Sequence, residues 1–393
     1  MSGNRIRLDK LGVVIAAIAV CGVFLAPFAT FRANRIVPGE ARTIFEALPS
    51  WAAVTLLLVL AVAAIIALLR VALPWRLAAS LAALAALMLL VGLAANHLTP
   101  PENTYARVSP ASGFWLLNFA FALLAADSFT RLRLTPVARI AVLALAALAV
   151  AAILYSGSWN GLSILKEYAN RADSFWAEAT KHVTLALGSL AAAVVAGIPL
   201  GILCHRVPAL RDAVLNVLNI IQTIPSIALF GILIAPLGWI AVHVPGAAEI
   251  GIRGIGAAPA FVALFLYSLL PVVANTVVGL AGVPPAANDA ARGVGMTARQ
   301  RLFSIEFPLA FPVILTGIRI VLVQNIGLAT IAALIGGGGF GVFVFQGIGQ
   351  TAMDLVLLGA VPTVVLAFAA AIILDAATEM TAFNGARNEA VTA

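Results

Sequence analysis

A group of polar side chains interrupts an otherwise apolar stretch of the chain around a proline. Gln222, Thr223 and Ser226 flank Pro225. Amide and hydroxyl groups can hydrogen-bond to a small polar solute, but they are costly where they face lipid. We therefore predict that these side chains line a translocation path or, equally, that they hydrogen-bond neighbouring helices.

Asn325 and Thr330 stand in a later apolar stretch and allow the same two interpretations. Arg319 lies within that stretch too, and we expect it to pair with a helix end or to extend toward the membrane surface. The run Gly336–Gly341 matches the letters of a dinucleotide-binding motif, G-x-G-x-x-G. No strand precedes it and no soluble domain surrounds it, so we predict a flexible outer gate loop instead.

The long polar interruption at residues 282–308 has the local signals of a short helix. Asn288 is a suitable N-cap, and Asp289 follows in the first turn, where a negative charge suits the helix dipole. Gly293 and Gly295 are expected to end this helix. We predict a short helix between these two signals.

A second short helix is predicted directly after the first. Thr297 and Gln300 have the spacing of a capping box, and Pro308 is expected to close the helix before the next apolar stretch. The pair forms a small helical hairpin that exposes Ala290 and Ala291. Small side chains at such a surface let the backbone of another protein approach closely.

Several other chemistries are absent from the sequence. No G-x-x-x-x-G-K-[ST] motif occurs, so the chain does not bind ATP through a P-loop. No serine or cysteine nucleophile with a histidine partner is apparent. The four histidines lie near the ends of apolar stretches without spacing suited to metal or haem: His97, His182, His205 and His243. We expect no cofactor, no metal and no catalytic residue in this chain.

The composition places the chain in a membrane. Of its residues 63% are hydrophobic and only 10% are charged, which is incompatible with a soluble globular domain. The basic residues behind the net charge of +7 are scattered singly and form no patch for nucleic acid. We predict an all-α polytopic membrane protein of about ten spans, with approximate limits 11–30, 52–69, 77–95, 112–126, 137–155, 182–204, 212–236, 257–281, 309–335 and 354–378.

The distribution of Lys and Arg predicts the orientation. With a cytoplasmic N-terminus, fourteen of these residues fall inside and eight outside, as the positive-inside rule favours. An even number of spans then places both termini in the cytoplasm.

The two halves of the chain differ in amino-acid composition. Residues 1–155 form five Ala/Leu-rich spans that are poor in proline, and residues 156–177 form a polar connector predicted to lie outside. Residues 178–380 contain many glycines and prolines, and residues 381–393 form a predicted cytoplasmic tail. Interrupted helices are tolerated where neighbours or a cavity satisfy the freed backbone groups. We therefore expect the second half to be the part that moves solute.

The hairpin segment resembles the EAA loop of ABC-importer permeases. Its pattern is E-A-A, three residues, G, nine residues, I-x-L-P, and this chain keeps every spacing with Asp for Glu and Phe for Leu. The matching residues are Asp289, Ala290, Ala291, Gly295, Ile305 and Pro308. The resemblance implies that this loop docks on a separate ATPase subunit, which binds ATP and Mg, and couples that subunit to the spans.

Two further segments resemble glycine betaine, choline and osmoprotectant permeases. They are Gln222–Leu229, with the letters QTIPSIAL, and Asn325–Gly341, which begins NIGLAT. The resemblance covers about residues 175–380, and the additional N-terminal spans are similar to one low-affinity branch. It implies a type I permease core in the bacterial inner membrane, a second permease chain and a periplasmic binding protein.

Three rival functions stay open on the sequence alone. An ion-coupled secondary transporter usually keeps a carboxylate in mid-membrane, whereas the second-half spans carry acids only near their ends, at Asp354 and Asp375. The second rival is an ABC permease for a different solute, such as an amino acid, and the third is a non-catalytic membrane scaffold. The spans show no aromatic cluster suited to a quaternary ammonium group, so the substrate follows only from the resemblance.

Overall fold

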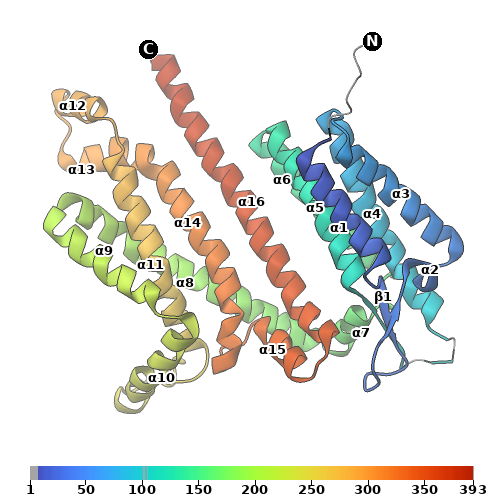
Figure 1. Ribbon diagram of the computed structural model, residues 1–393. Coiled ribbons are helices and arrows are strands. Elements are labelled where there is room, and N and C mark those ends of the chain that lie inside the picture. Colours follow the sequence, from blue (N-terminus) through green and yellow to red (C-terminus); the bar gives the residue numbers. More distant parts are fainter. Residues whose placement is uncertain (1–7, 101, 104, 393) are drawn as a thin grey trace, which may run out of the picture. The chain divides into compact units, whose positions relative to one another are not determined.

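The computed structural model describes residues 8–100, 102–103 and 105–392, with side chains described as far as residue 381. The chain divides into two compact units (Figure 1). The first comprises Met1–Thr135 and Ala144–Asn170, and the second comprises Pro136–Leu143 and Arg171–Ala393. Helix α6 (Pro136–Tyr155) contributes residues to both units.

Four helices form the body of the first unit: α1 (Lys10–Phe24), α3 (Ser50–Leu68), α4 (Leu73–Leu98) and α5 (Ser112–Leu132). Helices α1 and α4 each pack against both α3 and α5. Asp9 caps α1 by accepting a hydrogen bond from the Gly12 amide at 3.0 Å. The same carboxylate accepts one from the Arg76 guanidinium of α4 at 3.1 Å, which ties the start of α1 to its neighbour.

A small antiparallel sheet lies at one end of these helices. Its strands β1 (Ala29–Arg32), β2 (Glu40–Arg42) and β3 (Arg107–Pro110) have the order β2-β1-β3, and Ala29 faces both Arg42 and Pro110. The short helices α2 (Ile44–Ala47) and α7 (Ser163–Asn170) accompany it. The predicted span 11–30 was therefore too long, because the chain leaves the helix at Phe24 and pairs as a strand from Ala29.

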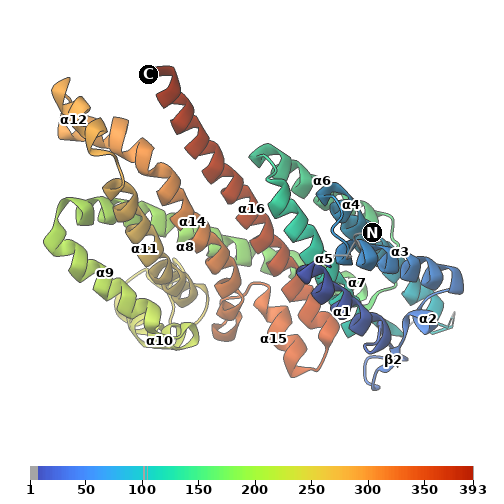
Figure 2. The same ribbon diagram turned by 45° about the horizontal axis from the view of Figure 1, so that its top comes forward.

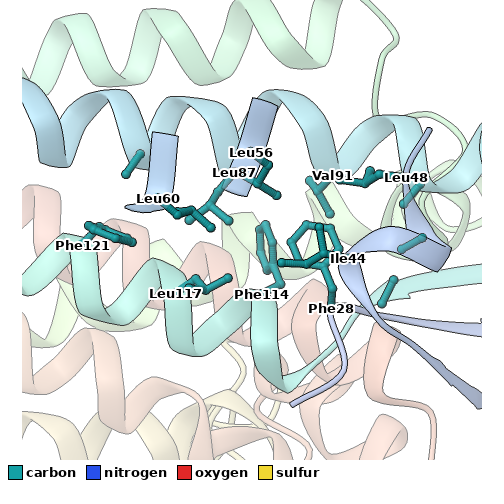
Figure 3. Close-up of a cluster of buried hydrophobic side chains, with 14 of the residues drawn as sticks. Phe28, Ile44, Leu48, Leu56, Leu60, Leu87, Val91, Phe114, Leu117 and Phe121 are labelled. Atoms are coloured by element: carbon teal, nitrogen blue, oxygen red, sulfur yellow. The ribbon is translucent and has the colours of Figure 1, made fainter. Parts of the chain in front are cut away.

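The apolar core of the first unit is continuous from the sheet end along the helices (Figure 3). The Phe114 ring meets the Phe28 ring edge-on, with centroids 5.9 Å apart. Helix α1 approaches the end of α3 so closely that a Cβ on Gly12 would lie 1.9 Å from the Ala67 carbonyl oxygen. The labelled core side chains are Phe28, Ile44, Leu48, Leu56, Leu60, Leu87, Val91, Phe114, Leu117 and Phe121.

The second unit combines long helices with short and interrupted ones (Figure 2). They are α8 (Ala172–Arg206), α9 (Pro208–Thr223), α10 (Ser226–His243), α11 (Ala257–Ala281), α12 (Pro285–Gly293), α13 (Ala298–Arg301), the π-helical turn Leu302–Glu306, α14 (Phe307–Ala329), the 3₁₀ turn Ile331–Ile335, α15 (Gly341–Gly349) and α16 (Met353–Thr392).

Helices α8, α11 and α14 pack against one another, and α16 packs against α14. Glycines allow the close approach. A Cβ on Gly201 would lie 2.6 Å from the Thr276 side chain, and one on Gly317 would lie 2.9 Å from the Pro271 carbonyl oxygen. Apolar contacts in this unit form several separate clusters.

Among the described residues, nine helices are long and apolar enough to cross a membrane, and α1 is a shorter apolar helix. The prediction of a predominantly helical, multi-span membrane protein is confirmed. One predicted span, 212–236, was wrong as a single helix, because the chain breaks between Thr223 and Ser226. Pro225 has no amide hydrogen and forces Ile224 out of the helical region, to a ψ of 126°.

Two other limits differ from those predicted. The fourth span extends to Leu132 rather than to residue 126. Helix α8 begins at Ala172 rather than near residue 182, so it absorbs part of the polar connector. Its added turns carry the Lys181–Glu178 pair at 2.7 Å, which suits the end of a helix that leaves the apolar region.

Candidate coupling and translocation site

The hairpin predicted from the capping pattern lies at one end of the second unit (Figures 1 and 2). Helix α12 ends at Gly293, and Gly295 adopts the left-handed conformation with φ 83°. Thr297 then begins α13 with a capping box, in which its amide donates to the Gln300 side chain at 2.8 Å. The turn at Gly295 and the capping box are therefore confirmed.

Four details of the hairpin prediction were wrong. Asn288 lies inside α12 and Asp289 lies beyond its first turn, because the helix already begins at Pro285, whose fixed φ suits a first turn. Ala290 is exposed, but Ala291 is buried at 4% exposure. Pro308 opens α14 instead of closing α13, because the π-helical turn carries the helix through without a stop.

The π-helical turn places a carboxylate in the interior. Glu306 is 3% exposed and receives a hydrogen bond from Arg206, the last residue of α8, at 2.5 Å. Apolar side chains around Leu280 and Ile314 pack beside the turn, together with Ile202 of α8. The hairpin is therefore fixed to the ends of α8, α11 and α14. Sequence reasoning missed this pair, because its members are separated by 100 residues.

The polar group around Pro225 faces α11. Gln222 donates to the Tyr267 carbonyl oxygen at 2.8 Å, and the Tyr267 hydroxyl donates to the Ile224 carbonyl oxygen. The freed carbonyl beside the proline is thus satisfied by a neighbouring helix. Thr223 is exposed and bonds within its own helix, to the Ile220 carbonyl oxygen at 2.7 Å.

Asn325 is completely buried where α8, α11 and α14 meet. Its amide donates to the Ser189 hydroxyl at 3.0 Å and to the Ser268 hydroxyl at 2.9 Å. This geometry favours helix packing over contact with a solute. Thr330 and Ser226 are half-buried, so the structure does not bring the five polar path candidates together at one point. Their lining of a path stays a prediction.

Arg319 forms an ion pair with Asp375 on α16, so its expected structural pairing is present within the bundle rather than at a helix end. Asp375 also contacts Arg139, at the start of α6, at 2.9 Å. Arg319, Gln324 and Asp375 border an open groove of about 590 Å³ on the outside of α14 and α16.

The glycine run Gly336–Gly341 lies at the opposite end of the unit from the hairpin, before α15 (Figure 1). It contains three left-handed residues, Gly336, Gly338 and Gly339. Two side chains of α8, Glu178 and His182, hold its backbone. Nothing in the sequence indicated these contacts beyond the position of His182 near a span end.

Comparison with known proteins finds a family model that matches each part of the chain. Residues 9–165 match the model of the N-terminal domain of ABC transporter permease YehY. Residues 193–380 match the model of the binding-protein-dependent transport system inner membrane component. The two matches together cover most of both compact units.

Curated relatives match the second part. The osmoprotectant import permease protein OsmW of Salmonella typhimurium is 43% identical over 195 residues, which are 50% of this chain and 84% of the relative. The choline transport system permease protein OpuBB of Bacillus subtilis is 36% identical over 187 residues, 48% of this chain and 79% of the relative. The solved MetNI methionine ABC transporter, in an inward-facing form, is 22% identical with a TM-score of 0.46, over 54% of this chain and 98% of that one.

Proposed function

Because the chain belongs to the binding-protein-dependent transport system inner membrane components, the permease subunits of ABC importers, we propose that it imports an osmoprotectant such as glycine betaine or choline. The second unit carries the solute, and a separate ATPase supplies the energy. The relatives named for osmoprotectant and choline transport support this substrate class.

The observation that carries the proposal is the hairpin α12–α13. It projects from one end of the unit, its turn at Gly295 is exposed, and Glu306 fixes its base to α8. A rigid, projecting element of this kind can transmit the movement of a bound partner to the spans. Asp289, Ala290 and Gly295 are the exposed residues of the proposed contact. Ala291 is buried and Ile305 is half-buried, whereas Pro308 is exposed in the first turn of α14.

Two glycines provide a matched test of this contact. Gly295 and Gly246 both have positive φ, 83° and 79°, and a Cβ at either would meet nothing within 4 Å. Gly295→Asp and Gly246→Asp therefore introduce the same strain and charge. We expect the ATPase to co-purify with the wild type and with Gly246→Asp but not with Gly295→Asp. Equal co-purification of all three would contradict the proposal.

The energy source is tested by uptake in intact cells. Radiolabelled glycine betaine should enter wild-type cells and stop entering when ATP is depleted while the proton gradient is kept. Undiminished uptake would support a secondary transporter instead. Competition by choline but not by methionine would support the substrate class, whereas the reverse would indicate an amino-acid permease.

The complex that we propose contains two permease chains, two ATPase subunits that hold ATP and Mg, and a periplasmic binding protein that selects the solute. It sits in the bacterial inner membrane with both termini of this chain in the cytoplasm. Gln222, Thr223, Pro225, Ser226, Asn325 and Thr330 belong to the proposed translocation machinery. Protease digestion of sealed vesicles from the inside would test the position of the C-terminus.

The first unit has a supporting role in this proposal. It packs around its own core and carries none of the proposed contact residues. A truncated chain beginning near residue 160 should therefore still assemble with the ATPase. Failure of that truncated chain to assemble, with a folded second unit, would show that the first unit does more.

A further inference from the structure

The conformation of the glycine loop Gly336–Gly341 is not fixed by its own residues. Gly336, Gly338 and Gly339 have φ values of 76°, 78° and 86°, which favour glycine, and glycine leaves the chain many other conformations. Residues 337–341 are nevertheless buried. A buried backbone amide needs a partner, so the loop depends on what its surroundings offer.

Carbonyl oxygens of the nearby backbone accept hydrogen bonds from only some of the loop's buried amides. The Gly336 and Gly337 amides donate to carbonyl oxygens of the preceding 3₁₀ turn, at 3.2 and 2.9 Å. Two later amides of the loop donate hydrogen bonds to side chains of α8. Gly339 donates to the Glu178 carboxylate at 2.6 Å, and Phe340 donates to Nδ1 of His182 at 3.3 Å.

The two α8 side chains are themselves fixed by packing and hydrogen bonds to their neighbours. His182 is completely buried, and its ring lies 4.9 Å from the Phe340 ring. Phe175, one turn before Glu178, also packs on Phe340, with ring centroids 5.3 Å apart. The Glu178 side chain is 14% exposed, and its second oxygen receives a hydrogen bond from Lys181 at 2.7 Å. An ionised acceptor makes the Gly339 bond stronger than a neutral one would be.

These contacts form the outermost of three polar links between α8 and the segment that contains α14. At the hairpin end, Arg206 binds Glu306, and in the middle Ser189 binds Asn325. At the far end, Glu178 binds Gly339, in the segment that continues α14. The same two elements therefore join the proposed ATPase contact to the glycine loop.

We propose that Glu178 and His182 are positioning residues that latch the glycine loop as the outer gate, and that the gate opens when the bond between Glu178 and Gly339 breaks. This inference rests on the proposed function. The middle link is buried and fully partnered, so it holds the two elements together. The outer link has a partly exposed carboxylate and a glycine backbone, so it opens more easily than the middle link, and Phe340 then leaves its packing against Phe175 and His182.

Two variants break the latch from opposite sides. Glu178→Ala removes the acceptor. Gly338→Ala leaves Glu178 in place but puts a Cβ 2.6 Å from its Oε2. Glu249→Ala is the matched control, because Glu249 is an exposed carboxylate in the segment between α10 and α11, at the same end of the unit.

The readout is the labelling of a cysteine placed behind the loop. Ala332 is completely buried, and its carbonyl oxygen receives the Gly337 amide. Ala332→Cys is introduced in a full-length chain that also carries Cys21→Ala and Cys204→Ala, assembled with its ATPase in vesicles without nucleotide. A membrane-impermeant maleimide is then added from the outer side.

We expect both latch variants to label about tenfold faster than the wild type, since a hydrogen bond to a charged group shifts an equilibrium by at least that factor. Glu249→Ala should label at the wild-type rate. Each latch variant should also hydrolyse more ATP per solute carried, because an unlatched gate lets solute return. Labelling within about twofold of the wild type in either latch variant would overturn the inference. Labelling needs no ATP, so it remains readable if ATP-driven uptake is not found.

Discussion

The two units of the chain bury their side chains in different ways. The first has one continuous apolar core that runs from its sheet along four helices. The second has several separate apolar clusters, and polar side chains link its helices between them. The clusters of the second unit share only partly buried side chains such as Ile221 and Ile198, so its helices can shift with less disruption than those around a continuous core.

Prolines follow the same division. Helices α1, α3, α4 and α5 of the first unit contain no proline beyond the first turn. In the second unit α8, α10, α11, α14 and α16 each have one in their interior: Pro199, Pro236, Pro271, Pro312 and Pro362. Interior prolines remove a hydrogen bond and kink a helix. The comparison indicates a rigid first unit and a second unit built to rearrange.

The largest expected effect tests the continuity of the first core. Phe121 of α5 is completely buried, and Phe119 of the same helix is 56% exposed. Phe121→Ala should destabilise the first unit by about 3–5 kcal/mol through lost burial and the cavity that remains. Phe119→Ala should have little effect. The measurement is the temperature at which the first unit becomes sensitive to protease. Equal shifts for both variants would contradict a single tight core.

A smaller effect is expected from the pair at the base of the hairpin. Arg206→Leu leaves the buried Glu306 without its partner, which should cost about 1–3 kcal/mol. Uptake should fall while the ATPase still co-purifies, because the hairpin remains but is no longer fixed to α8.

A control variant and a double variant test whether the loss of the pair causes this fall in uptake. Arg211→Leu is the control, since Arg211 is an exposed arginine just after the same helix end. Adding Glu306→Leu to Arg206→Leu removes the stranded carboxylate and should restore stability but not uptake. Full uptake by Arg206→Leu would show that the pair does not position the hairpin.

What the sequence could predict was local. The capping box of Thr297 and Gln300 and the left-handed turn at Gly295 depend on neighbours within a few residues. The long apolar runs likewise predicted helices that span a membrane. The family resemblance, carried by the spacing of the hairpin segment, agrees with the family to which the chain belongs.

What the sequence could not predict depends on distant partners. The pairs Arg206–Glu306 and Glu178–Gly339 join residues separated by 100 and 161 positions. The break before Pro225 was missed, because the polar residues and the proline around it were interpreted as an interruption within one apolar span. The strand Ala29–Arg32 was missed although its letters alternate between apolar and polar, because the first predicted span was extended over its first residues.

The middle polar link should have a modest effect. Asn325→Leu removes the donor to Ser189 and Ser268, yet both hydroxyls keep bonds to their own helices. Such links in membranes contribute about 0.6 kcal/mol on average and up to about 1.7 kcal/mol. Thr316→Val is the control, because that hydroxyl bonds only within α14.

The kinetics of Asn325→Leu separate the two interpretations of Asn325. If it packs helices, the maximal uptake rate falls and the KM for glycine betaine stays unchanged. A raised KM with unchanged stability would place Asn325 on the translocation path instead.

The smallest effect concerns the polar anchor of the rigid unit. The Arg76 guanidinium, which hydrogen-bonds Asp9, lowers the pKa of that carboxyl below its ordinary value of 3.8. A carboxyl whose pKa is lower in the folded state adds stability above its unfolded pKa and loses it as the pH falls through the folded value. The first unit should therefore be more stable than its Asp9→Asn variant at pH 6, and the difference should shrink below about pH 4. Protease sensitivity at a series of pH values measures this difference in stability.

Asp173→Asn, which changes an exposed aspartate of the second unit, should leave the stability of the first unit unchanged at every pH of the series. If the difference between wild type and Asp9→Asn did not vary with pH, the ion pair would not be what joins α1 to α4, and the rigidity of the first unit would rest on its apolar core alone.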